Sequence, residues 1–361
     1  MHQKLDCYLM EYARCHLMDR GNWNDEDGCN LLASVQYYEA TGESCYKDYV
    51  INFLHTYVRD DGSVSFFGQN PGIANLKISR ALFFAYHETN EEKYRKAIEG
   101  KFKMLLASSR CKCGNFWYSS NHPNQIWLEG LYAVYPFYMA YERAFDSFSR
   151  LGDISEQFMN VRRYLFDPEK KVYAQAYDEA HQQSWSDPRT GRSSEFSVRA
   201  IGLCMMSLVD CIELCDEQLY EHYRLLIDLL REGVKGILSY QEPLSHLFYR
   251  LVDLPASADN SLDTFGSSMI AYAILKAVRL HVLDEKYLQI GLDIFESIVN
   301  HALLDGNGTV NMVPFLHIEL QTDNNCLKCI PHEASADFCH DDKSAGFAFV
   351  MTAAEAAYLR R

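Results

Sequence analysis

Apolar residues recur at spacings of three and four along most of the chain, which is the pattern of helices that bury one face. The pattern predicts helices at 5–20, 31–39, between Tyr46 and Asp61, and at 78–88, 94–107, 126–145, 154–164, 199–215, 217–232, 267–280, 286–303 and 346–359. Short aromatic segments at 114–118, 172–177, 236–240 and 247–251 have a strand-like pattern. The sequence therefore predicts an all-α protein with short β-like loops.

A short motif precedes two of the predicted helices. Thr41-Gly-Glu-Ser-Cys-Tyr46 and Thr89-Asn-Glu-Glu-Lys-Tyr94 lie 48 residues apart, and Leu283-Asp-Glu-Lys-Tyr287 is a looser copy. This spacing is the length of two helices with their loops, so the predicted repeat unit is a helical hairpin. Hairpins of this kind form either an open solenoid or a closed ring.

Hydrophobic residues make up 48% of the 361 residues and are spread evenly, without a Pro/Gly/Ser-rich linker. We therefore expect one domain that covers 1–361. The formal charge of −15 argues against nucleic acid or an anionic membrane as a partner, because either would repel such a surface. The chain starts without the apolar segment of a signal peptide and has no apolar run of ~18 residues, which predicts a cytoplasmic protein.

The segment Gln125–Pro136 mixes an amide and a carboxylate with three aromatic residues, Trp127, Tyr132 and Tyr135. Gly130 costs about 1 kcal/mol relative to alanine inside a helix, which suggests that another group approaches the backbone closely there. The aromatic residues at helical spacing are equally typical of a core helix. Core packing does not explain Glu129, because glutamate is rarely buried without a partner. We therefore interpret the segment as the floor of a pocket.

Twelve cysteines are consistent with reduced thiols in the cytoplasm. Cys326, Cys329 and His332, followed by Cys339 and His340, have part of the spacing of a zinc site but lack a second paired knuckle. An ordinary Cys/His-rich loop fits this pattern better. We therefore predict no metal ion and no cofactor.

Two motifs resemble a known enzyme family. Gln125-Ile-Trp-Leu-Glu-Gly-Leu-Tyr132, followed by Pro136-Phe137, resembles the Q-x-W-L-D-G-L-Y-M-x-x-P-F signature of glycoside hydrolase family 105. These are unsaturated rhamnogalacturonyl hydrolases, related to the unsaturated glucuronyl hydrolases of family 88. The segment Ala176–Gly202 resembles that family's A-Y-D-E…W-A-D-P-x-T-G…R-A-x-G block, and the resemblance spans nearly the whole chain.

The resemblance implies an (α/α)6 barrel and an intracellular hydrolase that acts on acidic oligosaccharides produced by lyases. Such enzymes remove a terminal 4,5-unsaturated uronic acid by hydrating its C4=C5 enol ether. One carboxyl group donates a proton to C4 and helps to activate the water that adds to C5. Burial among aromatic rings disfavours the ionised carboxylate, which helps this group to carry a proton near neutral pH.

We predict Glu129 as the catalytic residue. The predicted substrate-binding residues are Gln125, Trp127, Tyr132, Gln175, Trp185, Arg199, Asn75 and Lys343. Arg199 has the shape to bind a uronate carboxylate through two hydrogen bonds, although an ion pair with Asp178 or Glu195 is an alternative. The aromatic residues are candidates for stacking on the sugar ring, and Lys343 belongs either to the cleft mouth or to a solvated run of charges.

The sequence departs from the family pattern around the expected chemistry. Glu129 replaces the catalytic aspartate, and moving a carboxyl by about 1 Å can cost on the order of 100-fold in rate. Ala74 occupies the position of a second aspartate, with Asn75 beside it, and Gln175 replaces a histidine. Two hypotheses remain: a hydrolase that uses Glu129, and a catalytically impaired protein that binds carbohydrate.

Overall fold

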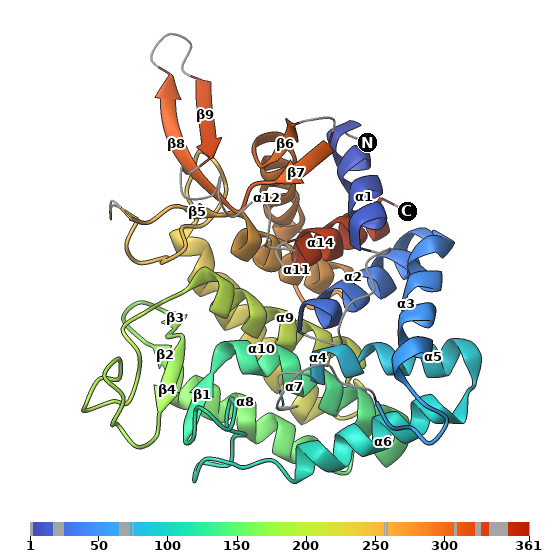
Figure 1. Cartoon of the computed structure of the whole chain (residues 1–361). Coiled ribbons are helices and arrows are strands. Elements are labelled where there is room, and N and C mark those ends of the chain that lie inside the picture. The colour runs from blue at the N-terminus through green and yellow to red at the C-terminus, as the bar shows by residue number, and fades with distance from the viewer. Residues whose placement is uncertain are drawn as a thin grey trace.

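The computed structural model describes residues 3–16, 25–64, 73, 76–255, 257, 259–306, 309–321, 326–331 and 346–360, and these residues form two layers of helices (Figure 1). The inner layer consists of α2 (Asp25–Thr41), α4 (Leu76–Ser79) with α5 (Ala81–Thr89), α7 (Leu128–Tyr141), α9 (Val198–Leu214), α11 (Thr264–Arg279) and α14 (Gly346–Tyr358). The outer layer consists of α1 (Gln3–His16), α3 (Ser44–Tyr57), α6 (Glu92–Leu106), α8 (Leu151–Leu165), α10 (Tyr220–Ile237) and α12 (Lys286–His301).

The inner helices form a closed ring. Along the series α2, α4, α7, α9, α11 and α14, each helix contacts the next, and α14 also contacts α2. Outer and inner helices alternate along the chain, and the pairs α2–α3, α5–α6, α9–α10 and α11–α12 are in contact. This arrangement is the predicted (α/α)6 barrel.

Burial distinguishes the two layers. All residues from Thr264 to Val278 in α11 are buried, and so are all residues from Gly346 to Ala356 in α14. Outer helix α10 buries only one side, which includes Leu226, Leu230 and Val234. A helix that is apolar on every side is stable only where neighbours surround it, so these sequences determine which helices line the interior.

The predicted hairpin repeat has matching geometry in its first two copies. Thr41 and Thr89 each donate a side-chain hydrogen bond to the carbonyl four residues earlier, and each hydroxyl accepts the N–H two residues later. The residue after each threonine, Gly42 or Asn90, has a positive φ. Tyr46 and Tyr94 are then buried at the start of the outer helix. The same local chemistry therefore turns the chain from the inner layer to the outer layer twice.

The strands are short and connect the helix ends. β1 (Gln125–Trp127) pairs antiparallel with β4 (Ala176–Asp178), and β2 (Phe166–Asp167) pairs with β3 (Val172–Tyr173). β5 (Leu262–Asp263), β8 (Phe315–Gln321) and β9 (Cys326–Pro331) form a three-stranded sheet, and β6 (Leu303–Gly306) pairs with β7 (Thr309–Met312).

Several predicted boundaries need correction. The segment predicted as a helix at 126–145 begins as strand β1, continues as α7 and ends in a π-helical turn, η2 (Glu142–Asp146). The helix predicted at 78–88 is divided at Arg80 into α4 and α5. The strand-like prediction at 236–240 is wrong, because this segment completes α10 and forms the 3-10 helix η3 (Leu238–Tyr240).

The error at 236–240 has a physical cause. A side chain at Gly236 would place its Cβ 1.9 Å from the carbonyl oxygen of Lys171, so the end of α10 lies against the β2–β3 turn. Ile237 is fully buried in the same contact region. An apolar residue next to glycine therefore indicates close helix packing here, although the same pattern predicts a strand.

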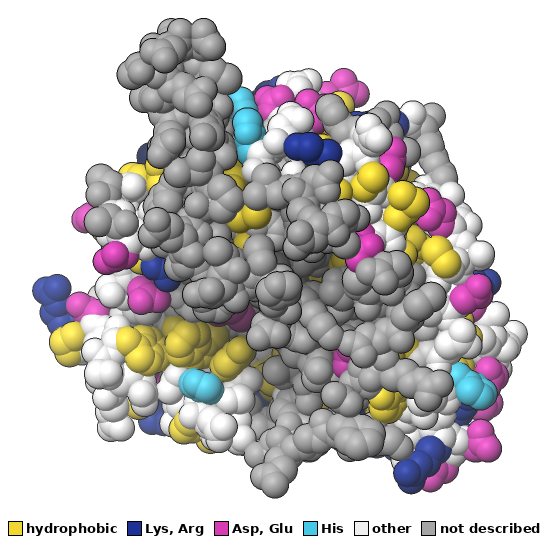
Figure 2. All heavy atoms as spheres, turned by 45° about the horizontal axis from the view of Figure 1, so that its top comes forward, with side chains coloured by type: hydrophobic (Ala, Val, Ile, Leu, Met, Phe, Trp, Pro, Cys, Tyr) yellow, Lys and Arg dark blue, Asp and Glu magenta, His cyan; other side chains and the backbone are white. Residues whose placement is uncertain are grey.

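None of the helices in the described residues combines the length and the apolar character needed to cross a membrane. Acidic side chains are spread around the outline of the face in Figure 2, with fewer basic ones between them. This distribution agrees with the net negative charge of the sequence.

Candidate active site

The starts of inner helices α7 and α9 are joined by the main chain of Gln175. Its carbonyl accepts a hydrogen bond from the N–H of Leu128 at 3.1 Å, and its N–H donates to the carbonyl of Glu195 at 2.9 Å. Leu128 is the first residue of α7, and Glu195 lies three residues before α9. The predicted residues Glu129 and Arg199 therefore lie in the first turns of neighbouring inner helices.

Glu129 is held by a neutral donor. Its Oε1 accepts a hydrogen bond of 2.6 Å from Nε2 of Gln175, whereas its buried Oε2 has no hydrogen-bond partner among the described residues. The side chain is half-buried as a whole. Oε1 is thus held in place, and Oε2 retains the capacity to hydrogen-bond another group.

The environment raises the pKa of Glu129 above its ordinary value of 4.5, mainly because burial removes water from the carboxylate. The hydrogen bond from Gln175 and the positive charge of Lys77 act in the opposite direction, and the charge of Glu195 adds to the increase. A carboxyl group in this setting retains its proton to a higher pH than an exposed glutamate does, as a general acid requires.

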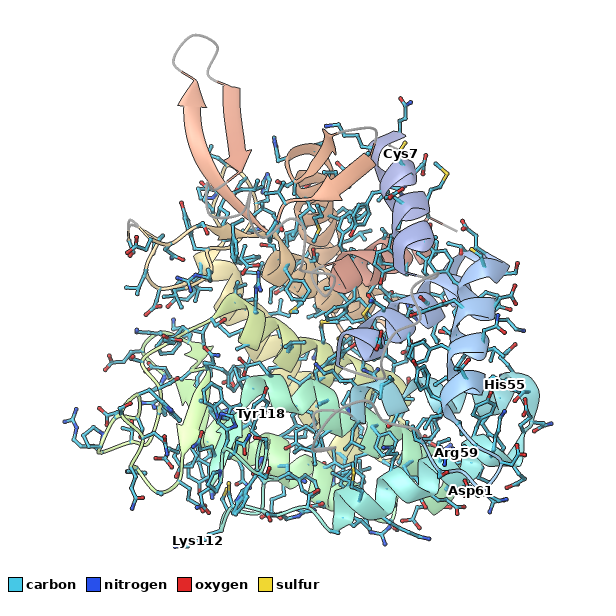
Figure 3. All side chains as sticks on the ribbon, in the orientation of Figure 1. Cys7, His55, Arg59, Asp61, Lys112 and Tyr118 are labelled. Carbon is cyan, nitrogen blue, oxygen red and sulfur yellow. The ribbon has the colours of Figure 1, made fainter. Side chains whose placement is uncertain are left out.

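An aromatic wall stands beside Glu129. The Trp127 ring meets the Trp185 ring edge to face at 5.4 Å and lies 5.8 Å from Tyr118 and 5.7 Å from His122. Tyr118, labelled in Figure 3, lies beside β1 and α7. A Cβ on Gly130 would approach its ring to 3.0 Å, so the glycine after Glu129 makes room for this aromatic side chain.

Gln125 supports the wall. Its Oε1 accepts a hydrogen bond of 2.9 Å from Nε1 of Trp127, and its side chain is almost entirely buried. The carbonyl oxygen of Gln125 also accepts from the N–H of Tyr118 at 3.1 Å. In this structure Gln125 orients Trp127, and through that ring it helps to define the side of the site.

Arg199 pairs with an acid that the sequence alternatives did not include. Its Nε donates to Oδ2 of Asp263 at 2.6 Å, and neither Asp178 nor Glu195 takes this role. The guanidinium lies over the rings of Phe265 and Phe315, at 5.0 and 5.1 Å from their centres. Its buried Nη2 has no partner among the described residues, so part of the guanidinium retains hydrogen-bonding capacity.

Tyr132 occupies the core, which corrects its prediction as a stacking residue. The side chain has no exposed surface, its hydroxyl donates to Sδ of Met351 at 3.8 Å, and Arg80 lies 5.0 Å from the ring centre. The motif placed it one helical turn beyond Glu129, but that position faces α14 across the barrel interior. Packing explains Tyr132 without a ligand.

Two predicted binding residues, Asn75 and Lys343, lie outside the described residues. The same holds for His332, Cys339 and His340 of the cysteine-histidine cluster. In the described part of the chain, no group of three or more His, Cys, Asp or Glu residues is arranged to hold a metal ion.

No sequence motif identifies Tyr118, His122, Lys77 or Asp263 as site residues. Asp263 had a detectable signal, because it precedes α11 and caps it by accepting the N–H of Gly266 at 2.8 Å. The buried Lys77 lies in the segment that resembles the family's second aspartate motif. Tyr118 and His122 occur in a polar loop, whose path over Trp127 no local pattern indicates.

The chain is similar in sequence to known proteins. A family model described as Glycosyl Hydrolase Family 88 matches residues 4–317. The unsaturated rhamnogalacturonyl hydrolase YesR of Bacillus subtilis is 24% identical over 276 residues, which cover 74% of this chain and 73% of the relative.

Solved structures of similar proteins share the fold. A family 105 glycoside hydrolase of C. acetobutylicum superposes with a TM-score of 0.84 at 28% identity, covering 99% of this chain and 98% of that one. The unsaturated glucuronyl hydrolase of Bacillus sp. GL1 superposes with a TM-score of 0.66 at 12% identity, covering 98% of this chain and 95% of that one.

Proposed function

Because the chain belongs to Glycosyl Hydrolase Family 88, we propose that it removes a terminal 4,5-unsaturated uronic acid from acidic oligosaccharides by hydrating the C4=C5 enol ether. The family and the fold are those of glycoside hydrolases. The proposal rests on the hydrogen bonding of Glu129. Its Oε1 is held by Gln175, and its buried Oε2 has no hydrogen-bond partner among the described residues.

In the proposed reaction, protonated Glu129 gives its proton to C4 of the unsaturated ring. The resulting carboxylate then accepts a proton from the water that adds to C5, which returns Glu129 to its starting form. The C5 hydroxyl belongs to a hemiketal, which opens to a C5 ketone and leaves a hemiacetal at C1. The hemiacetal then collapses to an aldehyde and releases the attached sugar as an alcohol. The raised pKa of Glu129 supports this role, because the reaction begins from the protonated form.

The other residues bind and orient the substrate in this proposal. Trp127 and Trp185 provide flat apolar surfaces for the unsaturated ring, and the free Nη2 of Arg199 is suited to the uronate carboxylate. The Gln175 amide prevents Glu129 from rotating away from C4. Asn75 and Lys343 are retained as proposed contacts from the sequence.

A second candidate is a protein that binds the same carbohydrates without turning them over. The observation that favours it is Gln175, which contacts Glu129 where the resembled family has a histidine. A primary amide donates a hydrogen bond but has no titratable proton near neutral pH. Under this hypothesis the pocket is an acidic-sugar receptor.

The test is an assay of unsaturated rhamnogalacturonan and glycosaminoglycan disaccharides, followed through loss of the enol-ether absorbance. The proposal predicts turnover by the wild-type protein and a decrease of about 10²–10⁴-fold in kcat for Glu129→Gln. Calorimetry with the same disaccharides accompanies the assay. Binding without turnover by the wild-type protein would reject the hydrolase and support the receptor.

A further inference from the structure

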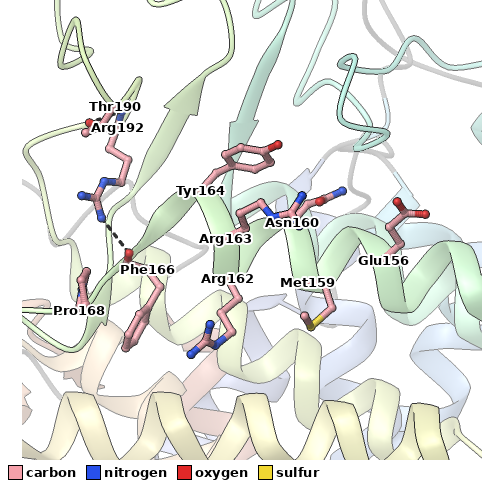
Figure 4. A pocket seen from close by; sticks show the side chains of 10 residues that line it. All are labelled: Glu156, Met159, Asn160, Arg162, Arg163, Tyr164, Phe166, Pro168, Thr190 and Arg192. Atoms are coloured by element: carbon pink, nitrogen blue, oxygen red, sulfur yellow. Dashed lines mark hydrogen bonds between the residues drawn. The ribbon is translucent and has the colours of Figure 1, made fainter.

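Two adjoining cavities lie between α8 and the loop that contains Trp185. The larger has a volume of about 670 Å³ and the smaller about 450 Å³, and both are lined by Thr190 and Arg192. We call them together the α8 trough. Figure 4 shows the larger cavity, with Arg162, Arg163 and Tyr164 from α8 on one side and Arg192 from the loop on the other.

The α8 trough is connected to the candidate active site through Trp185. This ring lines the smaller cavity and also meets Trp127, the residue that precedes α7, edge to face at 5.4 Å. A ligand in the trough would therefore approach the back of the same aromatic wall that borders Glu129.

The trough presents exposed guanidinium groups on a protein whose formal charge is −15. Three of its basic side chains are in ion pairs, Arg162 with Glu232, Lys170 with Asp253 and Arg192 with Asp167. The other two are Arg163 and Arg189, which line the trough together with Glu156 and Asp187. Because screening restricts exposed charges to about 8 Å at physiological salt, a ligand in the trough responds to these two guanidinium groups more than to the net charge of the protein.

Two of the arginines are available for a ligand. Arg162 is engaged by Glu232 through two hydrogen bonds of 2.8 and 2.9 Å, and Arg192 donates to the carbonyl of Phe166 at 2.8 Å. Arg163 and Arg189 are exposed, and neither forms an ion pair with a described carboxylate. Exposed guanidinium groups without an ion-pair partner can bind carboxylates or sulfates through paired hydrogen bonds.

The trough also has an apolar surface of the kind that accepts sugar rings. Tyr164 stacks on Tyr177 with 4.6 Å between ring centres, which holds its ring in a fixed orientation. Met159 is 43% exposed, and Phe166 lines the cavity beside Arg162. A fixed ring and apolar side chains beside free guanidinium groups match a ligand that alternates C–H faces with anionic groups.

We propose that the α8 trough binds the distal, reducing-end part of an acidic oligosaccharide whose non-reducing end occupies the Glu129 site. This inference rests on the proposed function, since it assigns a place to the remainder of that substrate. The trough then determines the length and charge of the oligosaccharides that bind tightly. Disaccharides occupy the Glu129 site alone, whereas longer acidic oligosaccharides also contact Arg163 and Arg189.

The test uses saturated oligosaccharides, whose binding does not require the double bond. Calorimetry compares saturated oligogalacturonates of increasing length with neutral oligosaccharides of the same lengths. We expect affinity to increase with length for the acidic series only, and the double variant Arg163→Glu/Arg189→Glu to weaken binding of the longer acidic chains by at least tenfold. The matched control is Lys96→Glu/Arg224→Glu, which makes the same charge change at exposed positions on α6 and α10.

The outcomes separate the two proposals. Equal binding of acidic and neutral oligosaccharides, or wild-type affinity in the trough variant, would overturn the proposal that the trough binds acidic oligosaccharides. If affinity increases with the length of the acidic oligosaccharides but no unsaturated substrate is turned over, the proposed role of the trough is supported and the hydrolase proposal is rejected. If turnover occurs, the trough variant should raise KM for longer unsaturated chains while kcat, and KM for disaccharides, stay at wild-type values.

Discussion

At the scale of single residues, the longer side chain of Glu129 is accompanied by a changed neighbour. The resembled signature has aspartate at this position, and the family has histidine where this chain has Gln175. The two departures meet in one hydrogen bond of 2.6 Å. We interpret them as a single adaptation, in which a neutral amide holds the longer acid.

The raised pKa of Glu129 leads to a prediction about stability. Because the folded protein disfavours the ionised side chain, stability decreases as the pH rises from the unfolded-state value, near 4.5, through the folded-state pKa. Glu129→Gln removes this effect and should therefore stabilise the protein at pH 7. Urea unfolding at pH 7 and pH 4 measures the difference, which should disappear at the lower pH. A destabilised variant at pH 7 would show that the carboxylate is structurally favourable.

The sequence identified several residues that lie together in the structure but not the partner of Arg199, for a physical reason. The sequence motifs identified Glu129, Gln175, Trp127 and Trp185, and the structure brings these four together. Arg199 was identified without its partner Asp263, which lies 64 residues away along the chain. Contacts of this kind depend on how inner helices pack, and a local pattern contains no information about them.

At the scale of elements, Gly130 lies where α7 packs against the loop that contains Tyr118. Gly130→Ala should improve helix propensity by about 1 kcal/mol but would place a Cβ 3.0 Å from the Tyr118 ring. We expect stability to change by less than about 1 kcal/mol, because the two effects oppose one another, while activity falls as the ring shifts against Trp127. Thermal unfolding and the disaccharide assay measure the two effects.

The control for this substitution is Gly100→Ala in α6, an exposed helical position with nothing within 4 Å of the added Cβ. This variant should be stabilised by about 0.5–1 kcal/mol with unchanged activity. If Gly130→Ala behaves in the same way as the control, the close approach of Tyr118 has no part in the site.

Helices were more predictable than strands. Their apolar spacing extends over three or more turns, so errors were confined to the ends and to breaks such as Arg80. The strands contain two to seven residues, too few for a clear pattern, and β1 and β5 also depend on partners far along the chain, β4 and β8. The hairpin of β8 and β9 was not predicted, and the resemblance to a family, more than the helical pattern, decided between an open solenoid and a closed ring.

At the scale of the whole molecule, a buried charge network links separate parts of the inner ring. Asp210 of α9 accepts hydrogen bonds from Arg80 at 2.6 Å, from Tyr272 at 2.7 Å and from Lys276 at 2.6 Å. Burial alone would raise the pKa of Asp210, but the charges of Lys276 and Arg80 outweigh it and lower the pKa. The network therefore stabilises the ring when Asp210 is ionised.

Asp210→Asn should destabilise the protein by about 3–5 kcal/mol at pH 7, because it leaves two buried cations without this carboxylate. The stabilisation is present above the unfolded-state pKa of aspartate, about 3.9, and is lost as the pH falls through the lowered folded-state pKa. Chemical unfolding as a function of pH measures it. The exposed pair of Arg95 and Glu92 provides the control, since Glu92→Gln should change stability by less than about 0.5 kcal/mol.

We also propose that 1–361 form one cooperative domain, as the sequence predicted. The buried apolar residues of the described chain form one cluster that extends from α1 to α14. Thermal unfolding followed by far-UV and near-UV circular dichroism should give one transition at the same temperature. Two separated transitions would indicate independent units.

The central claim is that Glu129 protonates C4 of an unsaturated uronyl ring, and isotope incorporation tests it most directly. The reaction of an unsaturated disaccharide is run in D₂O with the wild-type protein and with Glu129→Gln, and the product is examined by NMR and mass spectrometry. The account predicts one deuterium at C4 of the wild-type product, and a large decrease in this product with the variant. Release of an unsaturated sugar without deuterium at C4, or equal incorporation by the variant, would contradict it.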